Sequence, residues 1–420
     1  MLIGTLLKYH RKRLGLTQET LAEALVSKSF LSRIENNKVE AHEDTLTLLF
    51  KRLEVDYTFT KNWEEGIKEE LGEWEEYLTE NDRLSSERMY KQLNHKLNKI
   101  LSIDLLLEYH EKCIRHCKLQ GLSSVMRDSL KVLEEFFHSL DKKKKFFYFK
   151  YLGVHELYND NYEEAEKALS SALREFEAAF LPELELADVY YLYGKALYLN
   201  RKEAKSLYFT KLALKFFQDN YKLNMCAYAH LILGLIHNRL GNKDGSHSNI
   251  VKAKELAESQ DLTTLLGEIH HNLGIINIID KDICGATYNL KKSIELNEKV
   301  NTNKYIDSLL LLTYVRYTYE SPGEGLRIVE STLYNSGDKS MNPIQRVEVK
   351  FWGLFAVNKK EEWEVYVEKK LLPLLLEDRI DEKILIYSFL LASYYERNSY
   401  YKKSTYYYKL ILKVYSNYKL

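Results

Sequence analysis

An internal repeat of about 40 residues constrains the fold of this chain more than any other feature. Its markers are Gly153, Gly194, Gly234 and Gly274, which follow one another at intervals of 41, 40 and 40 residues. Small residues recur twelve and nineteen residues after each glycine, in two series: Ala165, Ser206, Ser246 and Ala286, and Ala172, Ala213, Ala253 and Ser293. In a two-helix repeat, the glycine and the first small residue let the paired helices pack closely, and the second small residue admits the next repeat.

The rest of the composition also favours helices. Only 4 of the 420 residues are proline, and no stretch sustains the apolar and polar alternation of a strand. The sequence therefore predicts an all-α protein with a right-handed α-solenoid as its body. The spacing resembles that of tetratricopeptide repeats, and longer helices would account for a period above the usual ~34 residues. Weaker copies are expected after residue 300, with Gly325 and Thr332 in register and a last pair near Ala392 and Ser404, for five to eight repeats.

A different pattern occupies the first 55 residues: a capped helix, a tight turn and a second helix. Thr17 is placed to cap a helix that carries Leu21 and Ala22 at apolar positions. The small side chain of Ala22 would let a second helix, from about residue 27 to residue 36, cross the first one closely. A further helix within residues 43–55 would close the small core. This arrangement is typical of a DNA-binding helix-turn-helix.

The outward face of the predicted second helix is polar and basic. It holds Lys28, Ser29, Ser32 and Arg33, which are side chains of the kind that reach base edges and phosphates from the major groove. Residues 1–38 contain seven Lys or Arg and three acids, whereas the whole chain has 61 of each sign. Because phosphate contacts supply much of the affinity of a DNA-binding protein, this local surplus favours a small DNA-reading head. A helical hairpin with a solvated basic face is the alternative.

The same segment resembles the lambda-repressor-like (XRE) helix-turn-helix family, through Thr17-Gln18, Leu21-Ala22 and the run from Ser32 to Glu35. That family usually has a glycine where this chain has Asn36-Asn37, and asparagine can also adopt the left-handed conformation. The resemblance implies that Gln18 clamps a phosphate, that the first turn of the second helix reads bases, and that Asn37 and Lys38 touch the DNA backbone. The expected DNA-binding residues are Thr17, Gln18, Ser27, Lys28, Ser29, Ser32, Arg33, Asn37 and Lys38.

In the solenoid, the first helix of each repeat is expected to line the inner surface, where extended peptides are usually held. Inward positions lie six and three residues before each glycine and one and four residues after it. They include Asp188, Tyr191, Lys195, Tyr198, Tyr228, Asn238 and His271. Asn can pair with both groups of a peptide backbone, Tyr can pack on side chains, and Lys can take a carboxylate. For each residue, an ordinary polar lining is the alternative.

Between head and solenoid, residues 63–77 read WEEGIKEELGEWEEY. They predict an acidic helix with an apolar stripe at three-to-four spacing, formed by Trp63, Ile67, Leu71, Trp74 and Leu78. The stripe could pack on its own body or on a second subunit. The expected domains are a helix-turn-helix domain at 1–58, a linker helix at 59–80 and a repeat solenoid at 81–420.

Signatures of enzymes and metal sites are weak. The sequence has no phosphate-binding glycine loop, no GxSxG and no HExxH. His110, Cys113 and Cys117 would share one helix face, but no CxxC pair completes a zinc site, so a half-buried helix face is favoured. With four scattered cysteines, no signal peptide and no apolar span of membrane length, we expect a cytoplasmic protein with no cofactor, metal or membrane partner.

The order of a repressor-like head, a linker helix and a long repeat body is similar to the Rap, Rgg, NprR, PlcR and PrgX family of peptide-responsive regulators of Gram-positive bacteria. The resemblance implies a transcription regulator, not an enzyme, that binds double-stranded DNA and holds a short signalling peptide in its groove. A homodimer is expected. The alternative is a repeat adaptor that sequesters a response-regulator protein, an activity that the same chain could also carry.

Overall fold

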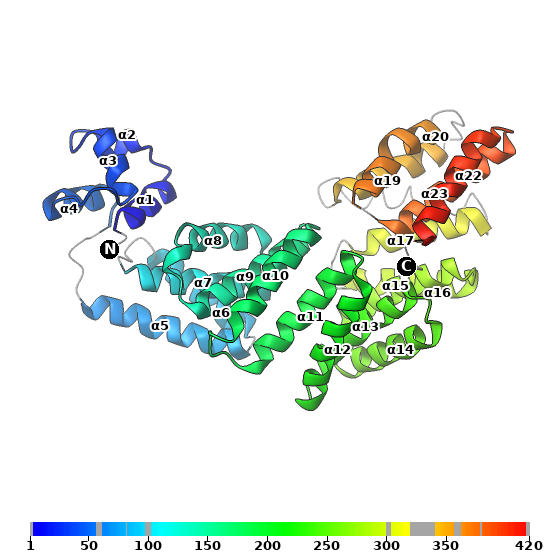
Figure 1. The fold of residues 1–420 in the computed structure, drawn as a ribbon, viewed down its shortest axis with the longest axis horizontal. Coiled ribbons are helices and arrows are strands. Elements are labelled where there is room, and N and C mark those ends of the chain that lie inside the picture. The colour runs from blue at the N-terminus through cyan, green and yellow to red at the C-terminus, as the bar shows by residue number, and fades with distance from the viewer. Residues whose placement is uncertain are drawn as a thin grey trace. The chain divides into compact units, whose positions relative to one another are not determined.

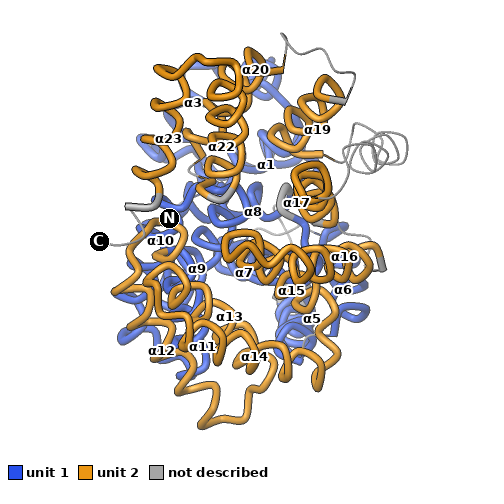
Figure 2. The backbone as a smooth tube through the Cα atoms, turned by 90° about the vertical axis from the view of Figure 1, so that its right-hand side faces the viewer, with its two compact units in different colours: residues 1–196 blue, residues 197–420 orange. Residues whose placement is uncertain are grey.

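The computed structural model describes residues 3–55, 61–80, 82–96, 102–299, 304–319, 341–356, 363–378 and 380–416. In these ranges every element is a helix, which confirms the all-α prediction (Figure 1). Among the described helices, none combines the length and the apolarity that a membrane span requires. The chain forms two compact units, residues 1–196 and 197–420 (Figure 2).

The first unit begins with the head, made of helices α1 (Ile3–Arg13), α2 (Gln18–Ala22), α3 (Lys28–Glu35) and α4 (Glu43–Arg52). Side-chain caps set the two central helices as the sequence predicts. The hydroxyl of Thr17 accepts a hydrogen bond from the backbone N–H of Thr20 at 3.1 Å, and that of Ser27 accepts one from Phe30 at 3.2 Å. Such caps satisfy backbone donors that the first turn of a helix leaves unpaired.

The turn after α3 fastens that helix to α1. Asn37 has φ +54°, the left-handed conformation expected of it. Its side-chain oxygen accepts from the N–H of Gly4 at 3.0 Å, and its amide donates to Thr5 at 2.7 Å. Gly4 is needed here because a Cβ would lie 1.8 Å from the carbonyl oxygen of Ile34. The head is thus closed by one asparagine and one glycine.

After the head, the first unit continues with α5 (Lys61–Glu80), α6 (Arg83–Lys96), α7 (Ile103–Gln120), α8 (Ser123–Glu135), α9 (Lys142–Tyr158), α10 (Tyr162–Phe176) and α11 (Glu183–Leu199). The apolar stripe of α5 is buried at Ile67, Leu71, Trp74 and Leu78, and the side chain of Trp63 lies outside the described residues. The indole of Trp74 donates to Ser86 of α6 at 3.0 Å. Of the two alternatives for the stripe, packing on the chain's own body is the one observed.

The second unit holds α12 (Glu203–Asp219), α13 (Leu223–Arg239), α14 (Lys243–Ser259), α15 (Thr263–Ile279), α16 (Ile283–Lys299), α17 (Lys304–Tyr319), α19 (Pro343–Ala356), α20 (Trp363–Tyr366), a π turn (Val367–Leu371), α21 (Leu372–Glu377), α22 (Asp381–Arg397) and α23 (Tyr401–Ser416). The expected last pair is confirmed, since Ala392 of α22 and Ser404 of α23 are both buried. Gly325 and Thr332 lie outside the described residues.

Close approach at the repeat glycines is confirmed in three repeats. A Cβ built on Gly153, Gly234 or Gly274 would come within 2.5 to 2.6 Å of a Leu or Ile side chain on the following helix. All eight small residues of the two series are between 0 and 4 % exposed. The paired helices therefore pack without room for a larger side chain at these positions.

The turn between the paired helices adds a feature that the sequence analysis did not predict. The residue seven positions after each repeat glycine has a positive φ, at Asp160 (+59°), Arg201 (+62°), Gly241 (+73°) and Lys281 (+62°). Glycine fills this left-handed position in one repeat only, and elsewhere a side chain is held there at a cost in backbone energy. The fold therefore fixes the backbone conformation of these turn residues.

Adding one carbon at the helix crossing should destabilise the second unit. We expect Gly234→Ala to lower its free energy of unfolding by about 1–3 kcal/mol, because the new Cβ would lie 2.5 Å from Cγ1 of Ile250 and 3.3 Å from the backbone of the same helix. The matched control is Gly353→Ala in α19, where a Cβ meets nothing within 4 Å. That change should stabilise by about 0.5–1 kcal/mol. Urea unfolding of both variants tests this, and equal effects would contradict the close packing.

Candidate functional site

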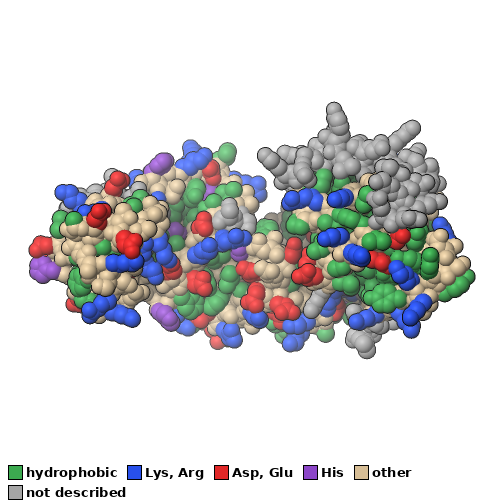
Figure 3. Space-filling view, turned by 90° about the horizontal axis from the view of Figure 1, so that it is seen from above, with side chains coloured by type: hydrophobic (Ala, Val, Ile, Leu, Met, Phe, Trp, Pro, Cys, Tyr) green, Lys and Arg blue, Asp and Glu red, His purple; other side chains and the backbone are tan. Residues whose placement is uncertain are grey.

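The predicted DNA-binding residues lie at the start of α2, along α3 and in the turn after α3. Thr17, Ser27, Lys28, Ser29, Arg33, Asn37 and Lys38 are exposed, and Gln18 and Ser32 are half-buried. The face of the molecule in Figure 3 shows basic side chains interspersed with acidic ones, as expected of a chain with 61 of each. The net charge of the whole chain therefore does not identify a DNA-binding region, whereas the geometry of α3 does.

A buried ion pair, which the sequence analysis missed, joins α3 to α1. Arg11 of α1 makes two bonds to the carboxylate of Glu35, from Nε at 2.6 Å and from a terminal nitrogen at 2.9 Å. Gln18 donates to the same carboxylate at 2.7 Å. Glu35 is 2 % exposed. It lies four residues after Leu31 and thus on the inward face of α3, which is the signal that could have revealed it.

Removing one partner of this pair should unfold the head. Arg11→Met leaves the Glu35 carboxylate buried without a cation, and breaking a buried pair in this way costs about 3–5 kcal/mol. We expect amide hydrogen exchange in α1–α4 to accelerate sharply while α13–α16 keep their protection. The double variant Arg11→Met with Glu35→Gln should recover part of the loss. Unchanged exchange in the single variant would show that the pair does not hold the head together.

The head is docked on the helices that follow it through the last turns of α1. The hydroxyl of Tyr9 and Nε2 of His110 share a buried hydrogen bond of 3.1 Å. Lys12 pairs with Glu135 of α8, and Arg13 donates to the carbonyl of Asn94. None of the predicted DNA-binding residues takes part in these contacts. Part of the basic surplus of the head is therefore used within the chain, and α3 stays exposed while α1 is held.

His110 connects the docked head to the first helix pair of the body. Its Nδ1 bonds the hydroxyl of Ser129 on α8 at 3.1 Å, so both ring nitrogens have partners inside the chain. Burial, with a smaller contribution from Arg13, lowers the pKa of His110 from 6.5 to about 3. Among the described residues, no group of three His, Cys, Asp or Glu side chains could hold a metal. The shared face of His110, Cys113 and Cys117 is a buried helix face.

Acid should weaken the docked state through His110. The unfolded imidazole takes up a proton as the pH falls below 6.5, and the folded one stays neutral down to about 3, so the stability held by the neutral ring is lost between these values. At pH 5 the loss is about 2 kcal/mol relative to pH 7. His110→Asn should reduce the pH dependence of unfolding by that amount. Equal pH dependence in the parent and His110→Asn would contradict this.

The predicted peptide-binding residues of the first unit lie on α11. Asp188 is bound within its own chain, because Lys150 and Lys118 contact its carboxylate at 2.5 and 3.4 Å. Burial alone would raise the pKa of Asp188, but these two cations outweigh it and hold the pKa well below its usual range. Tyr191 and Lys195 are half-buried on the same helix. Of the three, Asp188 has the clearest structural role.

In the second unit, the predicted residues lie on α11, α13 and α15. Tyr198 is buried, with the guanidinium of Arg239 3.6 Å from its ring centroid. His271 shares a hydrogen bond of 2.8 Å with Ser308 of α17. Tyr228 and Asn238 are half-buried. The structure gives packing or hydrogen-bonding partners to Tyr198 and His271, which is the alternative reading of these positions.

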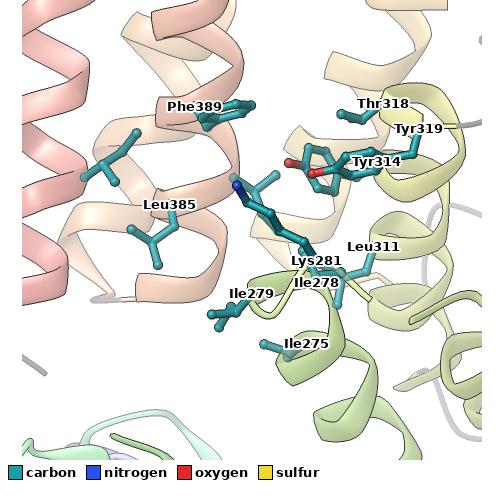
Figure 4. A pocket seen from close by; sticks show the side chains of 12 residues that line it. Ile275, Ile278, Ile279, Lys281, Leu311, Tyr314, Thr318, Tyr319, Leu385 and Phe389 are labelled. Carbon is teal, nitrogen blue, oxygen red and sulfur yellow. The ribbon is translucent and has the colours of Figure 1, made fainter. Parts of the chain in front are cut away.

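A cavity of about 500 Å³ in the second unit was not foreseen (Figure 4). It is lined by Ile275, Ile278, Ile279, Lys281, Leu311, Tyr314, Thr318, Tyr319, Leu385, Ile386, Phe389 and Ile411, which come from α15, α17, α22, α23 and the turn after α15. None of the predicted peptide-binding residues lines it. These residues come together only in the folded chain, where α22 and α23 lie near α15 and α17. No local sequence pattern predicts such a contact.

Helix α22, which forms one wall of this cavity, is held by ion pairs on two sides. Asp381 at its first residue pairs with Arg201, the left-handed turn residue before α12, at 2.7 Å. Lys383 contacts Asp307 of α17 at 2.9 Å and Glu348 of α19 at 2.6 Å. Burial raises the pKa of Glu348 although Lys383 opposes it. The start of α22 is thus tied to three other parts of the second unit.

Comparisons with known proteins agree with both parts of the chain. Residues 7–59 match the family model described as Helix-turn-helix. The transcriptional activator NprA of Geobacillus stearothermophilus is 25 % identical over 404 residues, which cover 94 % of this chain and 99 % of NprA.

Two solved structures show the same fold. A Rap protein complexed with Competence and Sporulation Factor has a TM-score of 0.70 at 15 % identity, covering 84 % of this chain and 98 % of that one. NprR in complex with its cognate peptide NprX has a TM-score of 0.63 at 16 % identity, covering 84 % and 99 %. The predicted architecture, a helix-turn-helix domain before a tetratricopeptide-like body, is confirmed.

Proposed function

Because the chain belongs to the Rap, Rgg, NprR, PlcR and PrgX family, we propose that it is a transcription regulator that reads double-stranded DNA with α3 and is controlled by a short peptide held by its repeats. The observation that carries the DNA part is the exposed polar and basic face of α3. Arg11, Lys12 and Arg13 have partners inside the chain, whereas Arg33 projects from α3 at an exposed position.

The geometry of the head supports the proposed DNA contacts. Ser27, Lys28 and Ser29 form the first turn of α3, where short polar side chains and backbone N–H groups can reach base edges and a phosphate. Lys28 bonds Glu19 of α2 in the free chain, and DNA would take over this exposed cation. Gln18 is oriented by Glu35, so its remaining amide hydrogen and carbonyl are available to a phosphate or a neighbouring side chain.

Whole-length similarity to NprA, a transcriptional activator, supports the regulation of transcription. The peptide part is supported by the fold shared with NprR, which was solved with its cognate peptide. Tyr191, Lys195, Tyr228 and Asn238 are half-buried on the first helices of their repeats, and could contact a peptide as well as their own neighbours. For control, the peptide must bind one arrangement of the chain better than another. Because α1 is docked on α7 and α8, a change in the arrangement of these helices would act directly on the head.

We assign the head to residues 1–58, the connecting helix to 59–80 and the repeats to 81–420, in a cytoplasmic, non-enzymatic homodimer. Two heads would read the two halves of a palindromic site, as is usual for helix-turn-helix dimers. The fold shared with a Rap protein favours one further candidate, the sequestration of a response-regulator protein by the same repeats.

Loss of the two exposed cations of α3 should abolish specific DNA binding. The purified full-length chain is first used to select its site from a pool of randomised double-stranded DNA. We expect Lys28→Ala with Arg33→Ala to bind that site at least about 100-fold more weakly, since each base or phosphate contact contributes on the order of 1–3 kcal/mol. Fluorescence anisotropy at fixed salt measures the affinity.

The matched control is Lys252→Ala with Lys291→Ala, which removes the same charge from exposed positions on α14 and α16. It should bind as the parent does. If the head variant also binds as the parent does, α3 is not the reading helix. If the parent selects no site at all, sequestration of a partner protein becomes the better account.

A further inference from the structure

The cavity in Figure 4 has the chemistry of a site for an apolar group that ends in a negative charge. Isoleucines of α15, Leu311 of α17 and Leu385 and Phe389 of α22 form apolar walls. Tyr314, Thr318 and Tyr319 of α17 add polar groups, and Lys281 is the only charged residue of the lining. Its side chain runs between the α22 wall and the ring of Tyr314. A ligand site of this kind is mostly apolar with a few polar groups that fix orientation.

Lys281 has the properties of a ligand-binding cation. Its φ of +62° places it at the left-handed turn between α15 and α16, so the fold fixes the point from which its side chain starts. Within the described part of the chain it makes no ion pair, whereas the equivalent turn residue Arg201 is paired with Asp381. An ammonium group beside an apolar surface is stabilised by a carboxylate, and none of the residues that line the cavity carries one.

The volume of the cavity and the charge of Lys281 together limit which chemical group can occupy it. The volume of about 500 Å³ is within the range of small-ligand sites and has room for one or two large apolar side chains. The last residue of a peptide combines an apolar side chain and a carboxylate on one Cα atom. An internal Leu or Phe lacks the charge, and an internal Asp or Glu lacks the apolar body, so neither complements both parts of the cavity.

We propose that this cavity anchors the carboxyl-terminal residue of the controlling peptide, with an apolar side chain between α15, α17 and α22 and the terminal carboxylate on Nζ of Lys281. The inference rests on the proposed peptide control and specifies which end of the peptide is read and how. A peptide bound in this way would also contact α22 through Leu385 and Phe389. The first residues of the same helix pair with Arg201, Asp307 and Glu348.

The test uses the full-length chain and a synthetic pool of heptapeptides, randomised at every position, made once with free carboxyl ends and once with carboxamide ends. Peptides retained by the chain on size-exclusion chromatography are identified by mass spectrometry. We expect the free-acid pool to be enriched at least fivefold in Leu, Ile, Phe or Met at the last position. The carboxamide pool should show no such enrichment.

Two variants locate the effect. Lys281→Met removes the charge and should abolish the enrichment, whereas Lys281→Arg should keep it. Lys291→Met, an exposed lysine on α16, is the matched control and should behave as the parent. Thermal unfolding confirms that each variant is folded. Once a single retained peptide is known, Lys281→Met should weaken its binding at least tenfold for the free acid and leave the carboxamide form unchanged.

The other outcomes are informative as well. Retained peptides with no preference at the last position, or equal retention of carboxamides, overturn the anchor and leave peptide control standing. Octanoate that binds in a Lys281-dependent manner while the peptides show no terminal preference assigns the cavity to a fatty acid instead. If the parent retains no peptide from either pool, the anchor fails together with the proposed peptide control.

Discussion

The structure depends on the close approach of paired helices at the repeat glycines. A Leu or Ile side chain of each second helix occupies the place where a Cβ of Gly153, Gly234 or Gly274 would be, and the buried small residues let neighbouring repeats stack in turn. Each pair cannot bury its apolar face alone, so the body is stable only as a stack. The same packing fixes the turn between the helices, and with it the directions of Arg201 and Lys281.

Two ion-pair systems then place the functional parts on this scaffold. In the head, Arg11 and Glu35 hold α1 against α3, and Glu35 also orients Gln18. In the second unit, Lys383 joins α22 to α17 and α19. Buried charges of this kind add little net stability compared with apolar residues of similar shape, but they penalise every arrangement that separates the partners. They favour one geometry for α3 and one for α22, which a regulator with alternative states requires.

Much of this fold follows from the sequence because its signals are local. The caps Thr17 and Ser27, the left-handed Asn37 and the glycine spacing are set within one or two turns of helix, where residue type and conformation are closely linked. The site is harder to predict. Lys281 is one of many exposed lysines, and only the fold shows that Leu385 and Phe389 line the same cavity. Asp188 is an inward polar residue in the sequence, and only the fold shows that Lys150 is its partner. Contacts between residues that are far apart in the sequence leave no periodic trace.

The central claim is that a peptide controls the DNA occupancy of this chain, and genome-wide occupancy in its host measures this most directly. The tagged protein is compared at equal expression in cells that do and do not produce the heptapeptide selected by the purified chain. We expect specific sites that are lost in the Lys28→Ala, Arg33→Ala variant and whose occupancy changes with that peptide. Specific sites whose occupancy is the same in both cells would contradict control by that peptide, and the absence of specific sites in either would contradict the regulator itself.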